Sequence, residues 1–510
     1  MAGMAHLSRI GEAAAISTAA IVAAAVAVPT GASATPSITW SACAETELSG
    51  FDCAAYEVPL DHDEPRGATT TIALARRPAD DPAHRIGTLF VNPGGPGGAG
   101  RGMVTRAADI ASPAVLARFD LVGFDPRGIG GSDPVQCHPT EEEAAAVLDR
   151  VTGVPLTAAE ISETLAARYE YTEACKANMG PLLTHMSTVN VAQDLDRLRR
   201  AVGDDKLTYL GFSYGTLLGA TYVNLFPQRV RAVILDGNVD PEQRTDHRLE
   251  NKFDRAGGFE IALSGFLAAC DEAGAACPFA GDARVRFDAL RERFRQGPVT
   301  IPGLGERTID DFTEFIGETL YDMAEFPETA ATLQLVYQVV FGQSARKITD
   351  VTFPKSSGLP SDDAYGFNSL DASLAVNCSD NPLPRNPAAY PAIADRFEAA
   401  HRTFGRAEAL SEAGCANWPR ITERYHGPWN KRTANTVLLL NPTFDPATRY
   451  DFALRMNREL GNARLLTLDG FGHTTRYSQC VTDWKSRYLL NGDVPPAGTR
   501  CTQDTPPFPG

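Results

Sequence analysis

The 510-residue chain lacks several features that would point to common classes of function. It has 47 Lys and Arg residues against 63 Asp and Glu, so its net charge is −16, and its basic residues form no patch along the sequence. An acidic surface of this kind argues against nucleic acids and anionic membranes as partners. Beyond residue 28, no stretch is apolar for long enough to predict a transmembrane helix.

Signatures of metals and nucleotides are also missing. No C-x-x-C motif occurs, and the nine histidines do not cluster at ligand spacing, so we expect no zinc site. A glycine-rich turn at 92–98 contains prolines and is followed by no P-loop lysine, which argues against nucleotide binding. We therefore expect no metal ion and no nucleotide, and we separately expect a monomer.

The chain does have the pattern of an export signal. Arg9 precedes an apolar stretch over 13–28, which Pro29 ends, and Ala32-Ser33-Ala34 fits a small-x-small cleavage site. We predict a signal peptide over 1–34, cleaved after Ala34, and a secreted protein. The alternative for this segment is a short buried or membrane helix.

Ten cysteines are an even number, and an exported chain can oxidise them. The sequence alone leaves many pairings open. We expect pairing between neighbours in the sequence: Cys43 with Cys53, Cys137 with Cys175, Cys270 with Cys277, Cys378 with Cys415, and Cys480 with Cys501.

Short apolar runs that alternate with helical patterns predict an α/β fold with a doubly wound, mostly parallel sheet. Two further runs, Tyr56–Leu60 and Thr70–Leu74, predict an antiparallel pair at the sheet edge. The buried strands are expected at Gly87–Val91, Phe119–Phe124, Leu207–Leu210, Val230–Leu235, Thr436–Leu440 and Ala463–Leu468.

The region from about Asp240 to Lys431 has a different pattern, with helical segments separated by Pro- and Gly-rich breaks. We interpret 241–430 as a helical cap inserted into a sheet domain formed by 35–240 and 431–510. Such a cap would cover the carboxyl edge of the sheet, where ligands bind in this architecture. The helices are expected at Gly258–Ala273, Ala283–Arg295, Ile309–Tyr321, Thr329–Phe341 and Pro391–Arg402.

The segment Gly211-Phe212-Ser213-Tyr214-Gly215 lies between a predicted strand and a predicted helix. A strand-to-helix turn this tight strains its central residue and exposes the side chain, and the flanking glycines avoid steric collisions. Ser213 is therefore the predicted nucleophile. The alternative is a glycine-rich turn with a capping serine.

A serine nucleophile needs a base, and the base needs an acid that orients it. His473 follows the last predicted strand and Asp445 follows the strand before it, in the order Ser, acid, His that α/β-hydrolases use. Asp236, at the end of an earlier strand, is the competing acid, and Thr448 is a possible hydrogen-bond partner of Asp445. The alternatives are a loop histidine and, for Asp445, a helix N-cap.

The developing oxyanion needs two backbone donors. We expect one from the N–H of Tyr214 and one from Gly95 in the turn at 92–98, with Gly94 as the alternative. The segment 125–133 is expected to be a tight turn in which Asp125 and Arg127 tie loops together; the alternative is contact with substrate.

Taken together, these motifs resemble secreted actinobacterial tripeptidyl aminopeptidases, which are α/β-hydrolase serine peptidases related to prolyl aminopeptidases. The resemblance implies an extracellular enzyme that releases short peptides from free N-termini without a cofactor. Relatives also include carboxylesterases, so a carboxylesterase or lipase is the alternative. The matching segments are 92–98, 125–132, 211–216, 235–241, 445–446 and the tail from 471 to 498.

Two residues depart from this resemblance: Thr474 and Ala99 stand where glycine and serine are frequent. Neither belongs to the predicted triad, whose intact residues argue against a catalytically inert binding protein. An exopeptidase must also bind the ammonium group of its substrate, and an acid in the cap is the natural partner. Asp380 is a candidate for this role, with a surface acid as the alternative.

Overall fold

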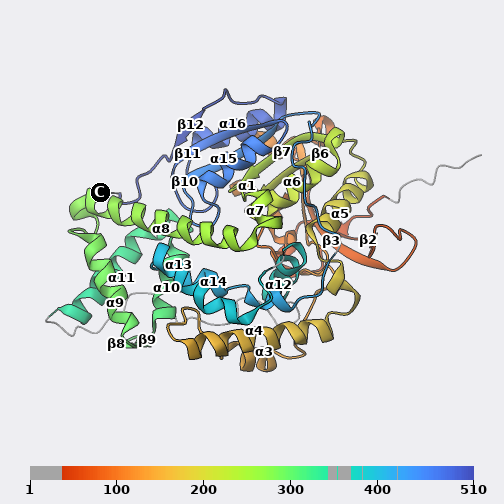
Figure 1. Ribbon diagram of the computed structural model, residues 1–510. Helices are drawn as coiled ribbons and strands as arrows, with labels where there is room; N and C mark the ends of the chain where they lie inside the picture. Colours follow the sequence, from red (N-terminus) through yellow and green to blue (C-terminus); the bar gives the residue numbers. More distant parts are fainter. Residues whose placement is uncertain (1–36, 343–352, 354–368, 382, 422, 510) are drawn as a thin grey trace, which may run out of the picture. The chain divides into compact units, whose positions relative to one another are not determined.

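The computed structural model describes residues 37–342, 353, 369–381, 383–421 and 423–509. The predicted signal peptide and its cleavage site at Ala34 lie outside the described residues. A ten-stranded sheet has the order β1-β2-β3-β5-β4-β6-β7-β10-β11-β12 (Figure 1). Its strands are β1 (Ser41–Ala42), β2 (Asp52–Pro59), β3 (Thr69–Arg77), β4 (Gly87–Asn92), β5 (Phe119–Phe124), β6 (Leu207–Phe212), β7 (Val230–Asp236), β10 (Val437–Phe444), β11 (Ala463–Phe471) and β12 (Arg500–Thr502).

The sheet confirms the predicted α/β-hydrolase architecture. The strands from β5 to β12 pair in parallel, whereas β2 and β3 form the predicted antiparallel pair at the edge. Each of the six apolar runs is a strand, and every residue of β4 and β5 is buried, as a sheet covered on both faces requires. The sequence analysis missed β1 and β12, since two or three residues are too few to show a pattern.

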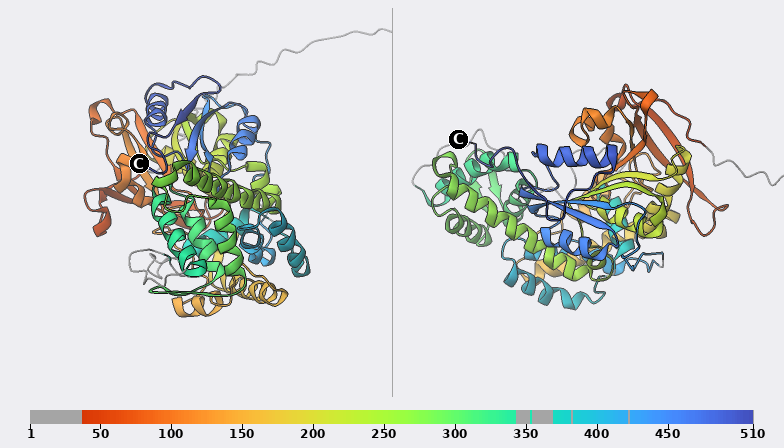
Figure 2. Two further views of the ribbon diagram at one scale, coloured as in Figure 1. Left: turned by 90° about the vertical axis from the view of Figure 1, so that its left-hand side faces the viewer. Right: turned by 90° about the horizontal axis from the view of Figure 1, so that it is seen from above.

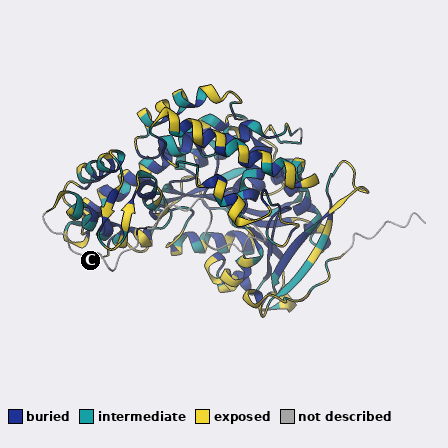
Figure 3. Cartoon of the chain, turned by 90° about the horizontal axis from the view of Figure 1, so that it is seen from below, coloured by how far each residue is buried: buried dark blue, intermediate teal, exposed yellow. Residues whose placement is uncertain are grey.

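Helices cover both faces of the sheet because alternate strand residues point to opposite sides. Phe90 packs in one hydrophobic cluster with α5 (Thr188–Ala201), α6 (Gly215–Leu225) and α15 (Tyr450–Glu459). Its neighbours Leu89 and Val91 pack in another cluster, with α1 (Ala107–Ile110), α2 (Pro113–Leu116) and α16 (Gln479–Asn491). Figure 3 shows the strands mostly buried and the helices exposed on their outer faces.

The segment between β7 and β10 is mainly helical, as predicted, and has its own cluster of buried residues with many phenylalanines. Its helix α8 extends away from the sheet toward α9 to α11 (Figures 1 and 2). The elements are α7 (Pro241–Asp246), α8 (Arg248–Ala273), α9 (Ala283–Arg295), the hairpin β8 (Val299–Ile301) and β9 (Gly305–Arg307), α10 (Ile309–Thr319), α11 (Phe326–Phe341), α12 (Ser369–Asp380), α13 (Tyr390–Ala400) and α14 (Gly405–Leu410).

Helix α8 begins at Arg248 rather than at the predicted Gly258. The glycine pair Gly257-Gly258 resembles a break in the sequence, but it serves a close approach to the sheet domain. A Cβ on Gly258 would lie 2.5 Å from the carbonyl oxygen of Pro446, so the helix packs directly on the loop after β10.

Two helices that the sequence analysis did not assign, α3 (Glu141–Leu148) and α4 (Ala158–Asn178), precede the nucleophile in the chain. Helix α4 packs with the inserted segment, since Thr172 Oγ1 donates to the carbonyl of Gly414 at 3.2 Å. The Asp310 carboxylate of α10 likewise accepts from the backbone N–H groups of Gly153 and Val154. Residues from before β6 thus contribute to the helical layer.

All ten cysteines are paired in the five expected disulfides. None of the helices in the described part of the chain has the length and hydropathy that crossing a bilayer requires.

Candidate active site

The predicted sharp turn is present between β6 and α6. Ser213 has a φ of 55°, in the left-handed region that non-glycine residues rarely adopt, and its N–H donates to the carbonyl of Asp236 at 2.9 Å. The surrounding glycines have no room for side chains. A Cβ on Gly211 would lie 2.4 Å from the carbonyl oxygen of Gly215, and one on Gly94 would lie 3.0 Å from Ser213 Cβ. The backbone strain at Ser213 is therefore a consequence of this tight, sterically crowded turn.

His473 and Asp445 meet at the neighbouring strand ends. Nδ1 of His473 lies 3.0 Å from both carboxylate oxygens of Asp445. The carboxylate also accepts from the N–H groups of Ala447 and Thr448 and from Thr448 Oγ1 at 2.9 Å, the contact expected from the sequence. Because an ionised carboxylate only accepts, Nδ1 carries a proton and Nε2 is left as the basic nitrogen.

The end of β7 brings His473 close to the serine turn. A Cβ on Gly237 would lie 3.3 Å from His473 Cε1, and the preceding residue, Asp236, binds the N–H of Ser213. In the described part of the chain, no hydrogen bond joins the Ser213 hydroxyl to His473. Such bonds are often long in free enzymes and tighten when substrate binds.

Asp236, the competing acid, has a different partner. Its two carboxylate oxygens accept from the N–H and the hydroxyl of Thr475, at 2.8 and 2.6 Å. Burial raises the pKa of Asp236, while the buried ammonium of Lys485 opposes this shift. The structure therefore brings Asp445, and not Asp236, to His473.

The backbone donors near Ser213 differ in their availability. The N–H of Gly94 donates to Asn92 Oδ1 at 3.0 Å, so that donor is occupied. Among the described residues, the N–H groups of Gly95 and Tyr214 have no acceptor. They follow β4 and β6, which are paired neighbours with Asn92 opposite Gly211. Two free donors thus follow adjacent strands, and this favours Gly95 over Gly94.

A residue of the inserted segment, Tyr321, contacts the histidine and was missed by the sequence analysis. Its carbonyl accepts the N–H of His473 at 2.8 Å, and its ring packs edge-on against the imidazole with centroids 5.2 Å apart. Arg255 donates to its hydroxyl at 3.2 Å. No sequence pattern links Tyr321 to a histidine so far along the chain, so only the fold reveals this contact.

Asp380 is buried behind the residue that follows the serine. Its carboxylate accepts from the N–H and the hydroxyl of Thr188, at 2.8 and 2.5 Å, and the Thr188 hydroxyl also bonds the Tyr214 hydroxyl. Burial raises the pKa of Asp380. Asp380 is only 3% exposed and both of its bonds go to Thr188, so the structure places it behind Tyr214 rather than at an accessible surface.

The turn at 125–133 ties loops together, as expected. The Asp125 carboxylate accepts from the N–H groups of Arg101 and Gly131. Arg127 is fully buried and pairs with Asp194 through two hydrogen bonds of 2.7 and 2.8 Å. These contacts join Asp125 and Arg127 to neighbouring segments of the chain.

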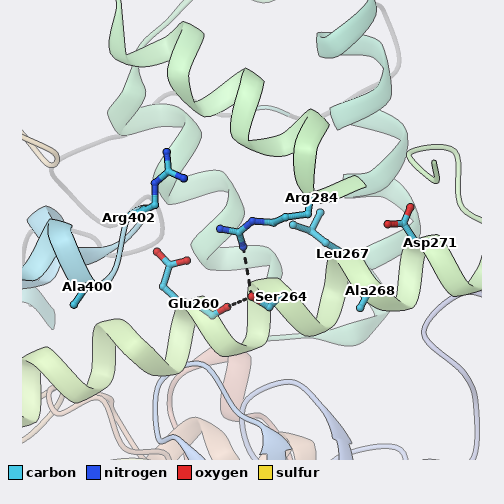
Figure 4. Close-up of a pocket in the computed structure, with 8 residues that line it drawn as sticks. All are labelled: Glu260, Ser264, Leu267, Ala268, Asp271, Arg284, Ala400 and Arg402. Carbon is cyan, nitrogen blue, oxygen red and sulfur yellow. Dashed lines mark hydrogen bonds between the residues drawn. The ribbon is translucent and has the colours of Figure 1, made fainter. Parts of the chain in front are cut away.

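Other candidate sites lie apart from these residues. A surface pocket of about 480 Å³ beside α8 is shown in Figure 4, where Ser264 accepts from Arg284 and donates to the carbonyl of Glu260. None of the predicted site residues lines it. Three groups of potential metal ligands occur among the described residues, but two of them consist largely of disulfide-bonded cysteines. The third is Asp61, Asp63 and Glu423.

Comparison with known proteins first defines the class. Residues 87–269 match the family model for the alpha/beta hydrolase fold, and residues 401–501 match the model for TAP-like proteins. The first match spans the serine turn and the second spans the His473–Asp445 pair. The protein is therefore a hydrolase of the α/β-hydrolase fold.

Full-length relatives then define the family. The chain is 32% identical over 499 residues to serine protease Hip1 of Mycobacterium tuberculosis, covering 91% of each chain. It is 32% identical over 482 residues to carboxylesterase B of the same species, covering 91% of this chain and 90% of the relative. It is 31% identical over 491 residues to tripeptidyl aminopeptidase of Streptomyces lividans, covering 92% and 88%. The chain belongs to the family of tripeptidyl aminopeptidase-like serine hydrolases.

Proposed function

We propose that this protein is a secreted serine exopeptidase that releases short peptides, tripeptides in particular, from free N-termini. The observation that carries the proposal is the hydrogen-bonded His473–Asp445 pair beside the strained turn of Ser213. The similarity to a tripeptidyl aminopeptidase over most of the chain supports the substrate class.

In the proposed reaction, Ser213 Oγ attacks the carbonyl carbon of the scissile peptide bond while His473 Nε2 takes the hydroxyl proton. The N–H groups of Gly95 and Tyr214 stabilise the oxyanion that forms. His473 then returns the proton to the leaving amine, which leaves an ester between Ser213 and the N-terminal fragment. Water hydrolyses this ester by the same steps, and Asp445 holds the imidazole and stabilises its charged form.

We propose the domain division as a signal peptide (1–34), a sheet domain (35–240 and 431–510) and a cap (241–430) that closes one side of the site. The contact of Tyr321 with His473 supports a cap that reaches the chemistry. Glu318 lies near the end of α10, three residues before Tyr321, and has no ion-pair partner among the described residues. Its side chain is accessible at the surface, although surrounding atoms desolvate the carboxyl and raise its pKa. We propose it as the acid that receives the substrate's ammonium group.

A carboxylesterase is the second candidate, because a relative with this name is as similar as the peptidases. A matched substrate panel separates the two: a tripeptide anilide with a free amino group, its N-acetyl form, and a short-chain p-nitrophenyl ester. We expect acetylation to lower kcat/KM about 100-fold, because it removes a charged hydrogen bond at a closed end of the site. Equal rates on both peptides, with faster ester hydrolysis, would favour the esterase.

Two variants test the roles proposed for Ser213 and Glu318. Ser213→Ala should lower turnover by about 10⁴-fold or more, since the hydroxyl forms the acyl intermediate. Glu318→Gln should raise KM for the free tripeptide about tenfold and leave the ester unaffected. Glu328→Gln, which changes an exposed glutamate of α11, is the matched control. A Glu318→Gln variant whose KM equals that of the control would remove Glu318 from the proposal.

A further inference from the structure

A second cavity lies next to the Cys378–Cys415 disulfide, at the C-terminal end of α12. It has a volume of about 410 Å³. Apolar walls are provided by Leu383, Ile421 and the disulfide. The polar lining residues come from two separate parts of the chain: Ser379, Asn381 and Arg385, and Trp418, Arg420 and Arg424. None of the proposed catalytic residues lines this cavity.

Several polar atoms of the lining residues are buried without a hydrogen-bond partner in the described part of the chain. They are Ser379 Oγ, both Nδ2 and Oδ1 of Asn381, and the indole N–H of Trp418. All three residues are at most 2% exposed. Buried polar groups are nearly always paired, and leaving them unpaired costs free energy. These three residues line the cavity, but their unpaired atoms have almost no accessible surface and reach it only when the side chains turn. A ligand that supplies both acceptors and donors would satisfy them in that orientation.

The charge of the lining indicates the nature of this ligand. Arg385, Arg420 and Arg424 line the cavity, whereas no acidic residue does among those the structure describes, although the chain as a whole carries a charge of −16. Arg385 and Arg424 use part of their guanidinium groups to bind the carbonyls of Trp418 and Asp380. Arg420 is exposed and has no partner among the described residues. An anionic group is thus the expected ligand.

We propose that this cavity binds the C-terminal end of a peptide, a carboxylate with an adjacent amide. Guanidinium groups bind carboxylates with two parallel hydrogen bonds, which suits the three arginines. The NH₂ of the Asn381 side chain can donate to the C=O of the last peptide group, and its carbonyl oxygen can accept from the N–H of that group. The hydroxyl of Ser379 and the indole N–H of Trp418 would provide the remaining contacts once their side chains turn toward the cavity.

The cavity is connected to the neighbourhood of the nucleophile. Ser379 and Asn381 line the cavity, whereas Asp380 between them binds Thr188, whose hydroxyl bonds the Tyr214 hydroxyl. The last turn of α12 therefore separates the peptide-carboxylate site from Tyr214. Binding at this site does not require the chemistry proposed for Ser213, so the two proposals can fail independently.

Calorimetric titration of the Ser213→Ala protein tests the site without turnover. The probes are an N-acetylated tripeptide acid, the same peptide as its C-terminal amide, and inorganic phosphate. We expect the acid to bind with one-to-one stoichiometry, and the amide and phosphate to bind at least about tenfold more weakly, since only the acid offers both the charge and the peptide group. If phosphate bound as tightly as the tripeptide acid, the peptide assignment would be overturned in favour of a simple anion site.

Substitutions of cavity residues test whether the peptide acid binds in this cavity. Arg420→Ala should weaken binding of the acid about tenfold, and Asn381→Leu should do the same. Arg66→Ala, which removes an exposed arginine from outside this cavity, is the control. Since Arg420 is exposed, its variant keeps the test valid even if Asn381→Leu does not fold. Equal affinity in the Arg420→Ala and Arg66→Ala proteins would exclude this cavity as the site.

Discussion

The carboxyl ends of β7 and β10 differ in what their aspartates do. The two strands are paired, with Asp236 opposite Leu440, and each presents a buried aspartate at or just after its end. Asp445 binds His473, whereas Asp236 binds Thr475, two residues further along the same loop. The same residue type in similar positions therefore serves two tasks, one that orients the imidazole and one that anchors the loop carrying it.

The loops account for this difference. After β10 the chain turns back so that Ala447 and Thr448 donate three hydrogen bonds to Asp445, which leaves it oriented toward the histidine. After β7 the carbonyl of Asp236 accepts the N–H of Ser213, and its carboxylate interacts with the charge of Lys485. We therefore expect Asp236 to act as a positioning residue, and matched substitutions at the two aspartates and their threonine partners test this difference.

Between the two aspartate sites, the largest expected effect is that of Asp445→Asn, which should lower kcat by about 10³–10⁴-fold. Asparagine favours the wrong imidazole tautomer and cannot stabilise the imidazolium. Steady-state kinetics, with circular dichroism as the control for folding, measures it. Combining it with His473→Ala should cost little more than His473→Ala alone, because the two residues act as one unit. If Asp236→Asn were the damaging change and Asp445→Asn nearly silent, the two roles would be reversed.

Thr448→Val should lower kcat about tenfold, because it removes the hydroxyl donor to Asp445 but keeps both backbone donors. Thr475→Val makes the equivalent change at Asp236 and should lower kcat less than threefold. Measuring both variants on one substrate checks the difference. Equal losses would mean that the two aspartates contribute to the chemistry in the same way.

Asp236→Asn should mainly affect stability, lowering the free energy of unfolding by about 1–3 kcal/mol. The amide replaces an acceptor oxygen with a donor opposite Thr475, and it leaves the buried ammonium of Lys485 without a nearby negative charge. Denaturant titration gives the free energy. Adding Lys485→Met should recover part of the loss, and no recovery would show that the Lys485 charge is unimportant here.

The smallest expected effect is on the pH dependence of stability. Because burial raises the pKa of Asp236, the folded protein holds this proton more tightly than the unfolded chain. Its contribution is therefore greatest below the ordinary aspartate pKa of about 3.9 and declines as the pH rises through the folded value. The stability advantage of the wild type over Asp236→Asn should shrink from pH 4 to pH 7. An advantage that grows with pH would contradict the raised pKa.

Much of the fold was predictable because its signals are local. Buried strands such as β4 and β5 are continuous apolar runs, and the turn at Ser213 needs glycines next to it in the sequence. The five disulfides join sequence neighbours. Helix α8 was misjudged at its start because Gly257 and Gly258 indicate a break, whereas here they allow close packing on Pro446. Helix α4 was not assigned although it contributes to the helical layer.

The sequence by itself determined the class of fold, the candidate Ser213 and the order of the acid and the histidine along the chain. Only the tertiary structure showed that Asp445 rather than Asp236 contacts His473, that the N–H of Gly94 already has an acceptor, that Asp380 binds Thr188, and that Tyr321 packs on His473. The physical reason is the separation along the chain over which each kind of interaction acts. Apolar periodicity and steric limits at glycine act between close neighbours in the chain, whereas the partner of a carboxylate or an N–H depends on which distant loops pack together.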